Sequence, residues 1–279
     1  MITCNLKGGL GNQLFQIFAT IAYSIEHNCV FKFLYTDTLG GNGSTKRVTY
    51  WETFLKQLKP FTLLYLPESM TTISEKEFSY NPLPKPESKT SDIILNGYFQ
   101  SYKYFEKYNS QICRFIKLTE HQTKTKSKYK NIQHGISIHF RLGDYKNLTY
   151  FHPIMTLEYY STALQYIIDS TENTSYTVWW FCESEDGDYV MENMIRPLHA
   201  KFPNCLFKRV EDTIEDWEQL IMMSCCKHNI IANSSFSWFA AYFNDSPEKI
   251  VCYPKQWFCG HGENIVVDDL FPKDWFKIQ

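Results

Sequence analysis

The second half of the chain constrains the fold most, because strand-like and helix-like segments alternate along it. Five short apolar segments are typical of buried strands: Gly135–Phe140, Thr177–Cys182, Cys205–Arg209, Asn229–Ala232 and Ile250–Tyr253. Between successive strands lie four segments with apolar residues at helical spacing: Leu157–Asp169, Tyr189–His199, Ile214–Cys226 and Ser235–Phe243. This alternation predicts a parallel sheet with right-handed crossovers, whose ligands bind at the carboxyl ends of the strands.

The first half opens with a strand, a glycine loop and a helix. Residues 1–6 are predicted to form the strand, Gly8–Gly11 the loop, and Asn12 to about His27 the helix. Two further strands are predicted at Cys29–Tyr35 and Ile93–Asn96. The glycines indicate a tight strand-to-helix turn or a close approach of the backbone to a ligand.

Two polar stretches separate these elements. Residues 67–92 are rich in Pro, Ser, Lys and Glu and are predicted to be a long surface loop. The polar stretch from Thr119 to Gln133 is predicted to be the domain boundary. We therefore expect two domains, residues 1–130 and residues 131–279.

Charge, cysteine content and hydropathy narrow the functional classes. The chain has 28 basic and 30 acidic residues, a balance that argues against a nucleic-acid partner. Its nine cysteines form no C-x-x-C pair and are expected to be free thiols of an intracellular protein. No apolar run is long enough to span a membrane and no signal peptide is evident, so the chain is expected to work in the cytosol.

The first candidate binding motif, His139-Phe-Arg-Leu-Gly-Asp144, ends a predicted strand. Alternation along an extended chain puts His139 and Arg141 on the same side. The planar fork of Arg141 matches a diphosphate in a bidentate manner. The residues leave a second interpretation equally open, in which Arg141 and Asp144 form a structural ion pair within a turn.

The second candidate motif, Asn233-Ser-Ser-Phe-Ser237, lies between a strand and a helix. Free N–H groups and the positive end of the dipole make a helix N-terminus an anion site. Ordinary capping by Ser234 or Ser235 is the simpler alternative. Together with Arg141 at the same edge of one sheet, the motif indicates a diphosphate held between a guanidinium and a helix N-terminus.

Two other patterns are weaker. Gly9 and Gly11 do not complete the G-x-G-x-x-G fingerprint, which disfavours a dinucleotide-dependent oxidoreductase. The acidic loop Glu183–Asp188 contains four carboxylates, but its spacing is not that of a calcium loop. A solvated loop with a helix-capping acid is the favoured interpretation there, and no metal site is predicted.

In register over nearly the whole chain, these motifs resemble the α-1,2-fucosyltransferases of the bacterial and viral type. The matching segments are Lys7–Gln16, Gly97–Phe105, His139–Tyr145, His152-Pro153 with Glu158–Tyr160, Met223–Trp238, Pro254 with Trp257-Phe258, and Asp269–Trp275. The resemblance implies a GT-B architecture, in which two Rossmann-like α/β domains face each other across a cleft. It also implies an inverting, metal-independent transfer of L-fucose from GDP-fucose to a galactoside or other glycan hydroxyl.

The resemblance also assigns roles. Residues 1–130 would handle the acceptor and residues 131–279 the GDP-sugar. Arg141 would stabilise the leaving diphosphate, and Asp144 would orient Arg141 or accept the acceptor proton, which otherwise leaves through water. The implied donor-binding set is His139, Arg141, Gln219, Asn233, Ser234, Ser235, Phe236 and Ser237, and the implied cleft loop contains Gly9, Gly11, Asn12 and Gln13.

One departure from the family pattern concerns the base. Gln219 stands where the family usually has an Asp, and in related fucosyltransferases a carboxylate in this region binds guanine. A carboxamide keeps an acceptor but loses the charge. Two alternatives therefore stay open: transfer of another GDP-deoxysugar such as GDP-rhamnose, and a non-catalytic sugar- or nucleotide-binding module.

Overall fold

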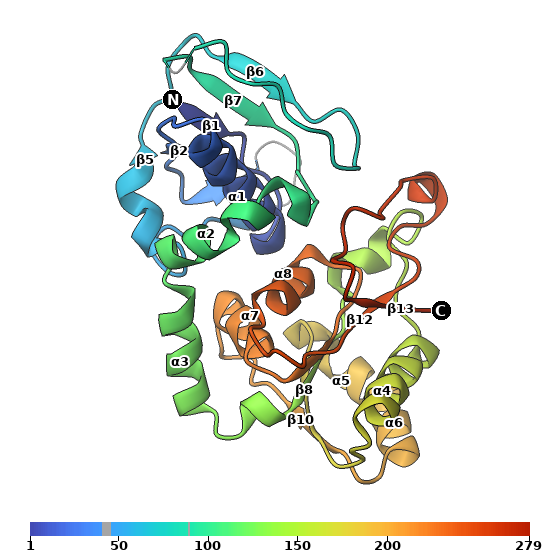
Figure 1. Ribbon diagram of the computed structural model, residues 1–279. Helices are drawn as coiled ribbons and strands as arrows, with labels where there is room; N and C mark the ends of the chain where they lie inside the picture. Colours follow the sequence, from blue (N-terminus) through green and yellow to red (C-terminus); the bar gives the residue numbers. More distant parts are fainter. Residues whose placement is uncertain (41–45, 89) are drawn as a thin grey trace. The chain divides into compact units, whose positions relative to one another are not determined.

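The chain divides into two α/β units in this computed structural model, which describes residues 1–40, 46–88 and 90–279 (Figure 1). Unit 1 comprises Met1–Thr119 with Val266–Pro272, and unit 2 comprises Glu120–Ile265 with Lys273–Gln279. The division therefore falls at Thr119 rather than at residue 130, and a late segment returns to unit 1.

The helices and strands are mostly short, as is usual for α/β proteins. The helices are α1 (Leu10–Glu26), α2 (Asn109–Phe115), α3 (Leu118–Lys128), α4 (Leu157–Thr171), α5 (Gly187–Val190), α6 (Arg196–Lys201), α7 (Asp216–Ser224) and α8 (Ser235–Phe243). The strands are β1 (Ile2–Cys4), β2 (Phe33–Leu34), β3 (Thr38–Leu39), β4 (Arg47–Val48), β5 (Thr62–Leu63), β6 (Thr71–Ser74), β7 (Ile93–Asn96), β8 (Ile136–His139), β9 (Thr177–Phe181), β10 (Leu206–Arg209), β11 (His228–Ile230), β12 (Val251–Pro254) and β13 (Phe276–Ile278).

Unit 2 is built on a six-stranded parallel sheet with the strand order β10-β9-β8-β11-β12-β13. The five predicted strands of this half correspond to β8–β12, and the predicted parallel sheet is confirmed. Helices pack on the sheet, which explains why β8 and β11 are buried along their whole length. The order reverses between β8 and β11, and open α/β sheets bind their ligands at such a reversal.

The last strand of this sheet gives no clear sequence signal. β13 pairs with β12 at the edge of the sheet, and only Ile278 of its three residues is buried. A three-residue edge strand shows neither an apolar run nor a full alternation. The pattern of the sequence therefore predicted five strands in unit 2 and missed this one.

Helix α3 occupies most of the polar stretch predicted to be a boundary. Gln122 is buried there, and its Nε2 donates to Ser224 Oγ at 3.2 Å and to the Phe243 carbonyl at 2.9 Å. Hydrogen bonds from Gln122 thus attach α3 to the rest of unit 2, although α3 has few apolar residues. Without an apolar periodicity, the sequence pattern could not reveal it.

Unit 1 contains a three-stranded parallel sheet with the order β6-β7-β1. The predicted strands at residues 1–6 and Ile93–Asn96 are β1 and β7, and the predicted helix is α1. The prediction that residues 67–92 form a loop is wrong at β6, whose polar residues Thr71, Thr72 and Ser74 are exposed. Polar, exposed edge strands are easily mistaken for loops, because they lack the buried apolar face whose residues would mark them as strands.

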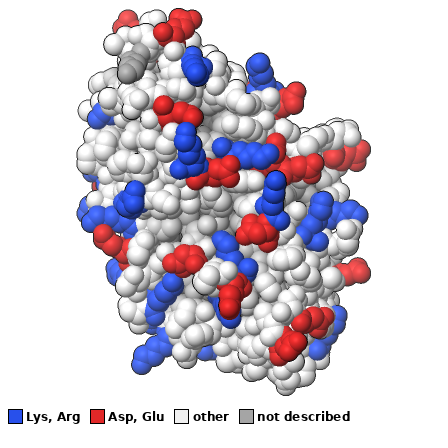
Figure 2. Space-filling model, viewed as in Figure 1, with Lys and Arg blue, Asp and Glu red and all other residues white. Residues whose placement is uncertain are grey.

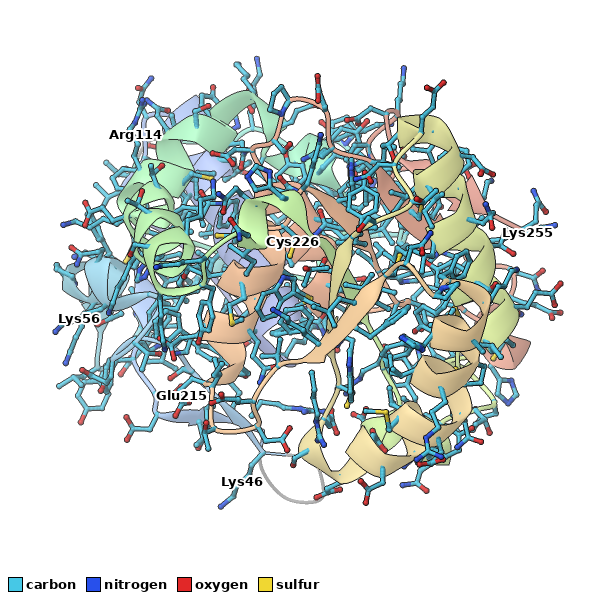
Figure 3. The ribbon with its side chains drawn as sticks, turned by 90° about the horizontal axis from the view of Figure 1, so that it is seen from below. Lys46, Lys56, Arg114, Glu215, Cys226 and Lys255 are labelled. Carbon is cyan, nitrogen blue, oxygen red and sulfur yellow. The ribbon has the colours of Figure 1, made fainter. Side chains whose placement is uncertain are left out.

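The distribution of charges on the surface and the state of the cysteines agree with the sequence, which has balanced charges and no C-x-x-C pair. On the face that Figure 2 shows, basic and acidic side chains are interspersed among the residues drawn. All nine cysteines are free, and Cys226 lies in the interior, whereas Lys255 points outwards (Figure 3). Of the helices in the described part of the chain, none is long and apolar enough to cross a membrane.

Candidate active site

The carboxyl ends of β8 and β11 bring the two predicted motifs together. The strands are neighbours, with Ile138 opposite Ile230, so the loops that follow them emerge side by side. Tyr145 Oη donates a hydrogen bond to the Asn233 carbonyl at 3.0 Å, which ties one loop to the other. The candidate site thus lies at the reversal of strand order, where an α/β sheet of this kind binds ligands.

Arg141 lies at the centre of this site and is held by two carboxylates. Its Nη2 donates to Asp144, and its Nη1 donates to Glu183, which follows β9. The guanidinium also lies over the ring of Tyr145, 5.1 Å from the ring centroid. Burial lowers the pKa of Arg141, but the two carboxylates outweigh this effect and raise the pKa above its ordinary value. The Arg141–Asp144 ion pair, one of the two open interpretations, is therefore present.

The acidic loop that follows β9 is part of the site. Asp186 is 1% exposed, accepts a hydrogen bond from the Gly143 N–H at 2.8 Å and pairs with Lys146. Gly143 has φ +38°, and a Cβ there would lie 2.3 Å from a carboxylate oxygen of Glu183. The prediction of a solvated loop is wrong for Asp186, because the ends of β8 and β9 are adjacent and their loops meet.

Glu183, Asp186 and Lys146 are therefore site residues that sequence reasoning missed. Their signal was an acidic loop directly after a predicted strand, but the sequence did not show that this strand lies next to β8. As for metal binding, within residues 1–40, 46–88 and 90–279 no three His, Cys, Asp or Glu side chains come close enough to hold an ion.

His139 is buried beside Arg141. The centroid of its ring lies 5.6 Å from that of the Phe236 ring, so this residue of the first motif also lies beside the second motif. Burial lowers its pKa to about 3, and the charge of Arg141 acts in the same direction. Its Nδ1 is buried without a hydrogen-bond partner among the described residues. His139 is thus neutral at physiological pH and offers no positive charge.

The residues of the second motif divide into two groups. Asn233 Nδ2 donates to the carbonyls of Pro153 and Trp257, and the buried Ser237 hydroxyl donates to Ala232 and Ser234. These two side chains fix the loop. Ser234 caps α8 by accepting from the Phe236 N–H at 3.4 Å, as the simpler interpretation expected. Ser235 and Phe236 are half-buried, which leaves the first turn of α8 accessible to a ligand.

Gln219 lies in α7, where its Nε2 donates to the Ile214 carbonyl at 2.9 Å. One of its two amide N–H groups is therefore used by the chain just before α7, and Figure 3 labels Glu215, the residue that precedes this helix. The carboxamide oxygen and the second N–H group are left for recognition of a base. That role stays a prediction.

Side-chain amides hold the glycine loop of unit 1 and the start of α1. Gln13 Nε2 donates to the carbonyls of Gly8 and Val48, and Gln13 is buried, so it supports the loop. Gly9 precedes α1, and Gly11 is buried in its first turn. The carboxamide oxygen of Asn12 accepts from Gln100 at 2.8 Å. The predicted cleft role of this loop thus rests on its backbone and on Asn12 rather than on Gln13.

A comparison of the whole sequence with models of protein families identifies its family. The model of glycosyl transferase family 11 matches residues 1–279. The chain belongs to glycosyl transferase family 11. This family 11 protein is therefore a glycosyltransferase, which agrees with the resemblance found from its motifs.

Two Escherichia coli proteins are similar to the family 11 enzyme over nearly their full lengths. The O-antigen biosynthesis glycosyltransferase WbnK is 27% identical over 314 aligned positions, covering 96% of this chain and 98% of that protein. An alpha-1,2-colitosyltransferase is 25% identical over 302 positions, covering 100% of this chain and 99% of that protein.

Likenesses to solved structures are weaker. The structure of POFUT1 in complex with GDP-fucose covers 90% of the family 11 chain and 97% of its own, at 12% identity and a TM-score of 0.49. E. coli ADP-heptose LPS heptosyltransferase II covers 57% and 43%, at 13% identity and a TM-score of 0.37. At TM-scores below 0.5 neither likeness bears on the fold, which the strand order of each sheet establishes.

The buried state of His139 predicts a pH dependence of stability. Its pKa is about 3 when folded and about 6.5 when unfolded, so the unfolded chain binds the extra proton and stability falls as the pH drops below 6.5. Between pH 7 and pH 5 this costs about 2 kcal/mol of unfolding free energy. Urea denaturation of His139→Gln at both pH values should show a fall smaller by about that amount.

The exposed His134 provides the matched control. The His134→Gln variant should lose as much stability between pH 7 and pH 5 as the wild type does. An unchanged pH dependence in His139→Gln would contradict the buried, neutral state of His139.

Proposed function

We propose that this family 11 enzyme transfers L-fucose from GDP-fucose to a hydroxyl of a galactoside or another glycan, in α-1,2 linkage and with inversion. The proposal rests mainly on one observation: Arg141 and the first turn of α8 follow adjacent strands at the reversal of strand order. In the GT-B division of labour that the proposal includes, unit 2 binds the GDP-sugar and unit 1 binds the acceptor.

The diphosphate is the part of the donor that this arrangement suits. Arginine has five N–H donors, and the pairs with Asp144 and Glu183 use only two of them. The remaining donors can bind phosphate oxygens while the carboxylates keep the guanidinium in one plane. The N–H groups and dipole of α8 favour the same negative charge. His139 beside them is neutral and adds no positive charge.

In the reaction, the bond between the anomeric carbon and the GDP oxygen breaks while the acceptor oxygen bonds to the opposite face of that carbon. GDP leaves with the electron pair, and its growing negative charge is met by Arg141 and α8. The acceptor hydroxyl loses its proton to Asp144 or to water. Asp144 already pairs with Arg141, so it can also act simply by orienting the guanidinium.

A second candidate for the transferred sugar is the colitosyl group, because one relative is named as an alpha-1,2-colitosyltransferase. GDP-rhamnose is a further alternative. Calorimetric titration with GDP and with each GDP-deoxysugar, with turnover measured in parallel, separates these cases. Binding and turnover of GDP-fucose support the proposal. Binding without turnover of any GDP-sugar would contradict it and favour a binding module.

Replacement of Arg141 should impair catalysis far more than folding. Arg141→Ala should lower kcat by roughly 10²–10³-fold, because a preorganised donor to the leaving group is lost. Arg141→Lys should also fail substantially, since an ammonium cannot form the planar fork. Arg196 is 69% exposed and pairs with Glu192 four residues earlier, so Arg196→Lys is the matched control. Near-normal turnover in Arg141→Ala would rule out this role.

Metal independence is a separate prediction. Glu183 and Asp186, the acidic-loop residues directed into the site, already pair with Arg141 and Lys146. We therefore expect transfer to continue after exhaustive chelation with EDTA. Loss of activity that Mg²⁺ or Mn²⁺ restores would instead make the acidic loop a metal site.

The departure at Gln219 predicts weak selectivity for guanine. A charge-assisted hydrogen bond exceeds its neutral counterpart by on the order of one kcal/mol. Gln219→Asp should therefore raise the preference for GDP over ADP and UDP several-fold, as measured from dissociation constants of the three nucleotides. Gln133, an exposed residue of the same unit, serves as the control through Gln133→Asp. Unchanged ratios in Gln219→Asp would show that this position does not read the base.

A further inference from the structure

The sheet of unit 1 also has a carboxyl edge, and three chain segments meet there. Glu75 follows β6, Gly97–Gln100 follows β7, and Lys7 follows β1, in a parallel sheet in which these strands are neighbours. Open α/β sheets bind ligands at this edge. The donor site of unit 2 uses none of these residues.

The segment after β7 is held in an unusual backbone conformation. Glu75 accepts hydrogen bonds from the N–H groups of Tyr98 at 2.7 Å and Phe99 at 2.9 Å. Phe99 has φ +53°, which bulky residues rarely adopt, and its side chain is fully buried. Gly97 is required as well, because a Cβ there would lie 2.4 Å from Glu75 Cβ. Strained residues held in this way are concentrated at functional sites.

This clamp fixes the backbone that carries a partly exposed aromatic ring. Tyr98 is 38% exposed, while Phe99 next to it is drawn into the core. The ammonium of Lys7 lies over one face of the Tyr98 ring, 4.6 Å from its centroid. The backbone of Lys7 is itself fixed, because Gln16 bonds to both its N–H and its carbonyl. Other exposed aromatic residues, such as Tyr65, have no clamp of this kind among their described hydrogen bonds.

We propose that Tyr98 is the platform on which a neutral sugar ring of the acceptor stacks, with Lys7 donating hydrogen bonds to its hydroxyls. The inference rests on the proposed function and names the acceptor subsite within it. One face of a hexose presents C–H groups that pack on an aromatic ring, and its hydroxyls need donors at the rim. The face of Tyr98 opposite Lys7 offers the aromatic ring, and the long Lys7 side chain can reach the rim to offer the donor. Gln100, in the segment after β7, donates to Asn12 in the first turn of α1, the helix that follows the Lys7 loop.

The test is steady-state kinetics with a galactoside acceptor and GDP-fucose. Tyr98→Ala should raise the KM for the acceptor roughly 3- to 10-fold, as expected for the loss of one aromatic contact. The KM for GDP-fucose and the dissociation constant of GDP should stay within about twofold of wild type. Tyr98→Phe keeps the ring and should stay near the wild type, whereas Tyr98→Leu keeps apolar bulk and should resemble Tyr98→Ala.

Tyr65→Ala is the matched control, since Tyr65 is 85% exposed in the same unit. An unchanged acceptor KM in both Tyr98→Ala and Tyr98→Leu would overturn the inference, as would a rise confined to the KM for GDP-fucose. The second outcome would assign Tyr98 to the donor sugar. If the wild type neither bound GDP nor turned over a GDP-sugar, the proposed function itself would fail, which is a distinguishable result.

Discussion

The ion pairs of Arg141 are the interaction on which the candidate active site of unit 2 depends. A half-buried guanidinium is stable only when it is paired, and here the partners come from the ends of two adjacent strands. Glu183 and Asp144 fix the plane of the fork, and Asp186 fixes the backbone of the same loop through Gly143. The acidic loop after β9 thus preorganises a positive charge at the place where GDP would leave.

The two units solve the same structural problem with different chemistry. In unit 2, charged side chains hold the loop after β8. In unit 1, carboxamides and one carboxylate hold the loops: Gln13 and Gln16 bind the glycine loop, and Glu75 binds the turn after β7. In both units, side-chain hydrogen bonds hold the loops at the carboxyl edge of a parallel sheet. Rigid loops lose little entropy on binding, which favours catalysis by preorganisation.

The elements that could be predicted are those with a buried face. Helix α8 begins and ends where the apolar pattern placed it, because Ser234 caps an apolar segment. The placement of Arg141 and the α8 motif at the same edge of one sheet followed from the alternation of strands and helices, but the adjacency of β8 and β11 did not. Helix α3, β6 and β13 were missed, since they are polar or at an edge. The burial of Asp186 was also missed, because it depends on which strands are neighbours, and single-strand patterns do not specify this.

The central claim is that Arg141 binds the diphosphate of a GDP donor. Calorimetric titration with GDP and with GMP, in the wild type and in Arg141→Ala, tests it most directly. The second phosphate should make GDP bind the wild type at least tenfold more tightly than GMP, by about 1.4 kcal/mol or more, and the variant should lose most of that preference. An equal GDP-to-GMP preference in both proteins would show that Arg141 does not contact the diphosphate.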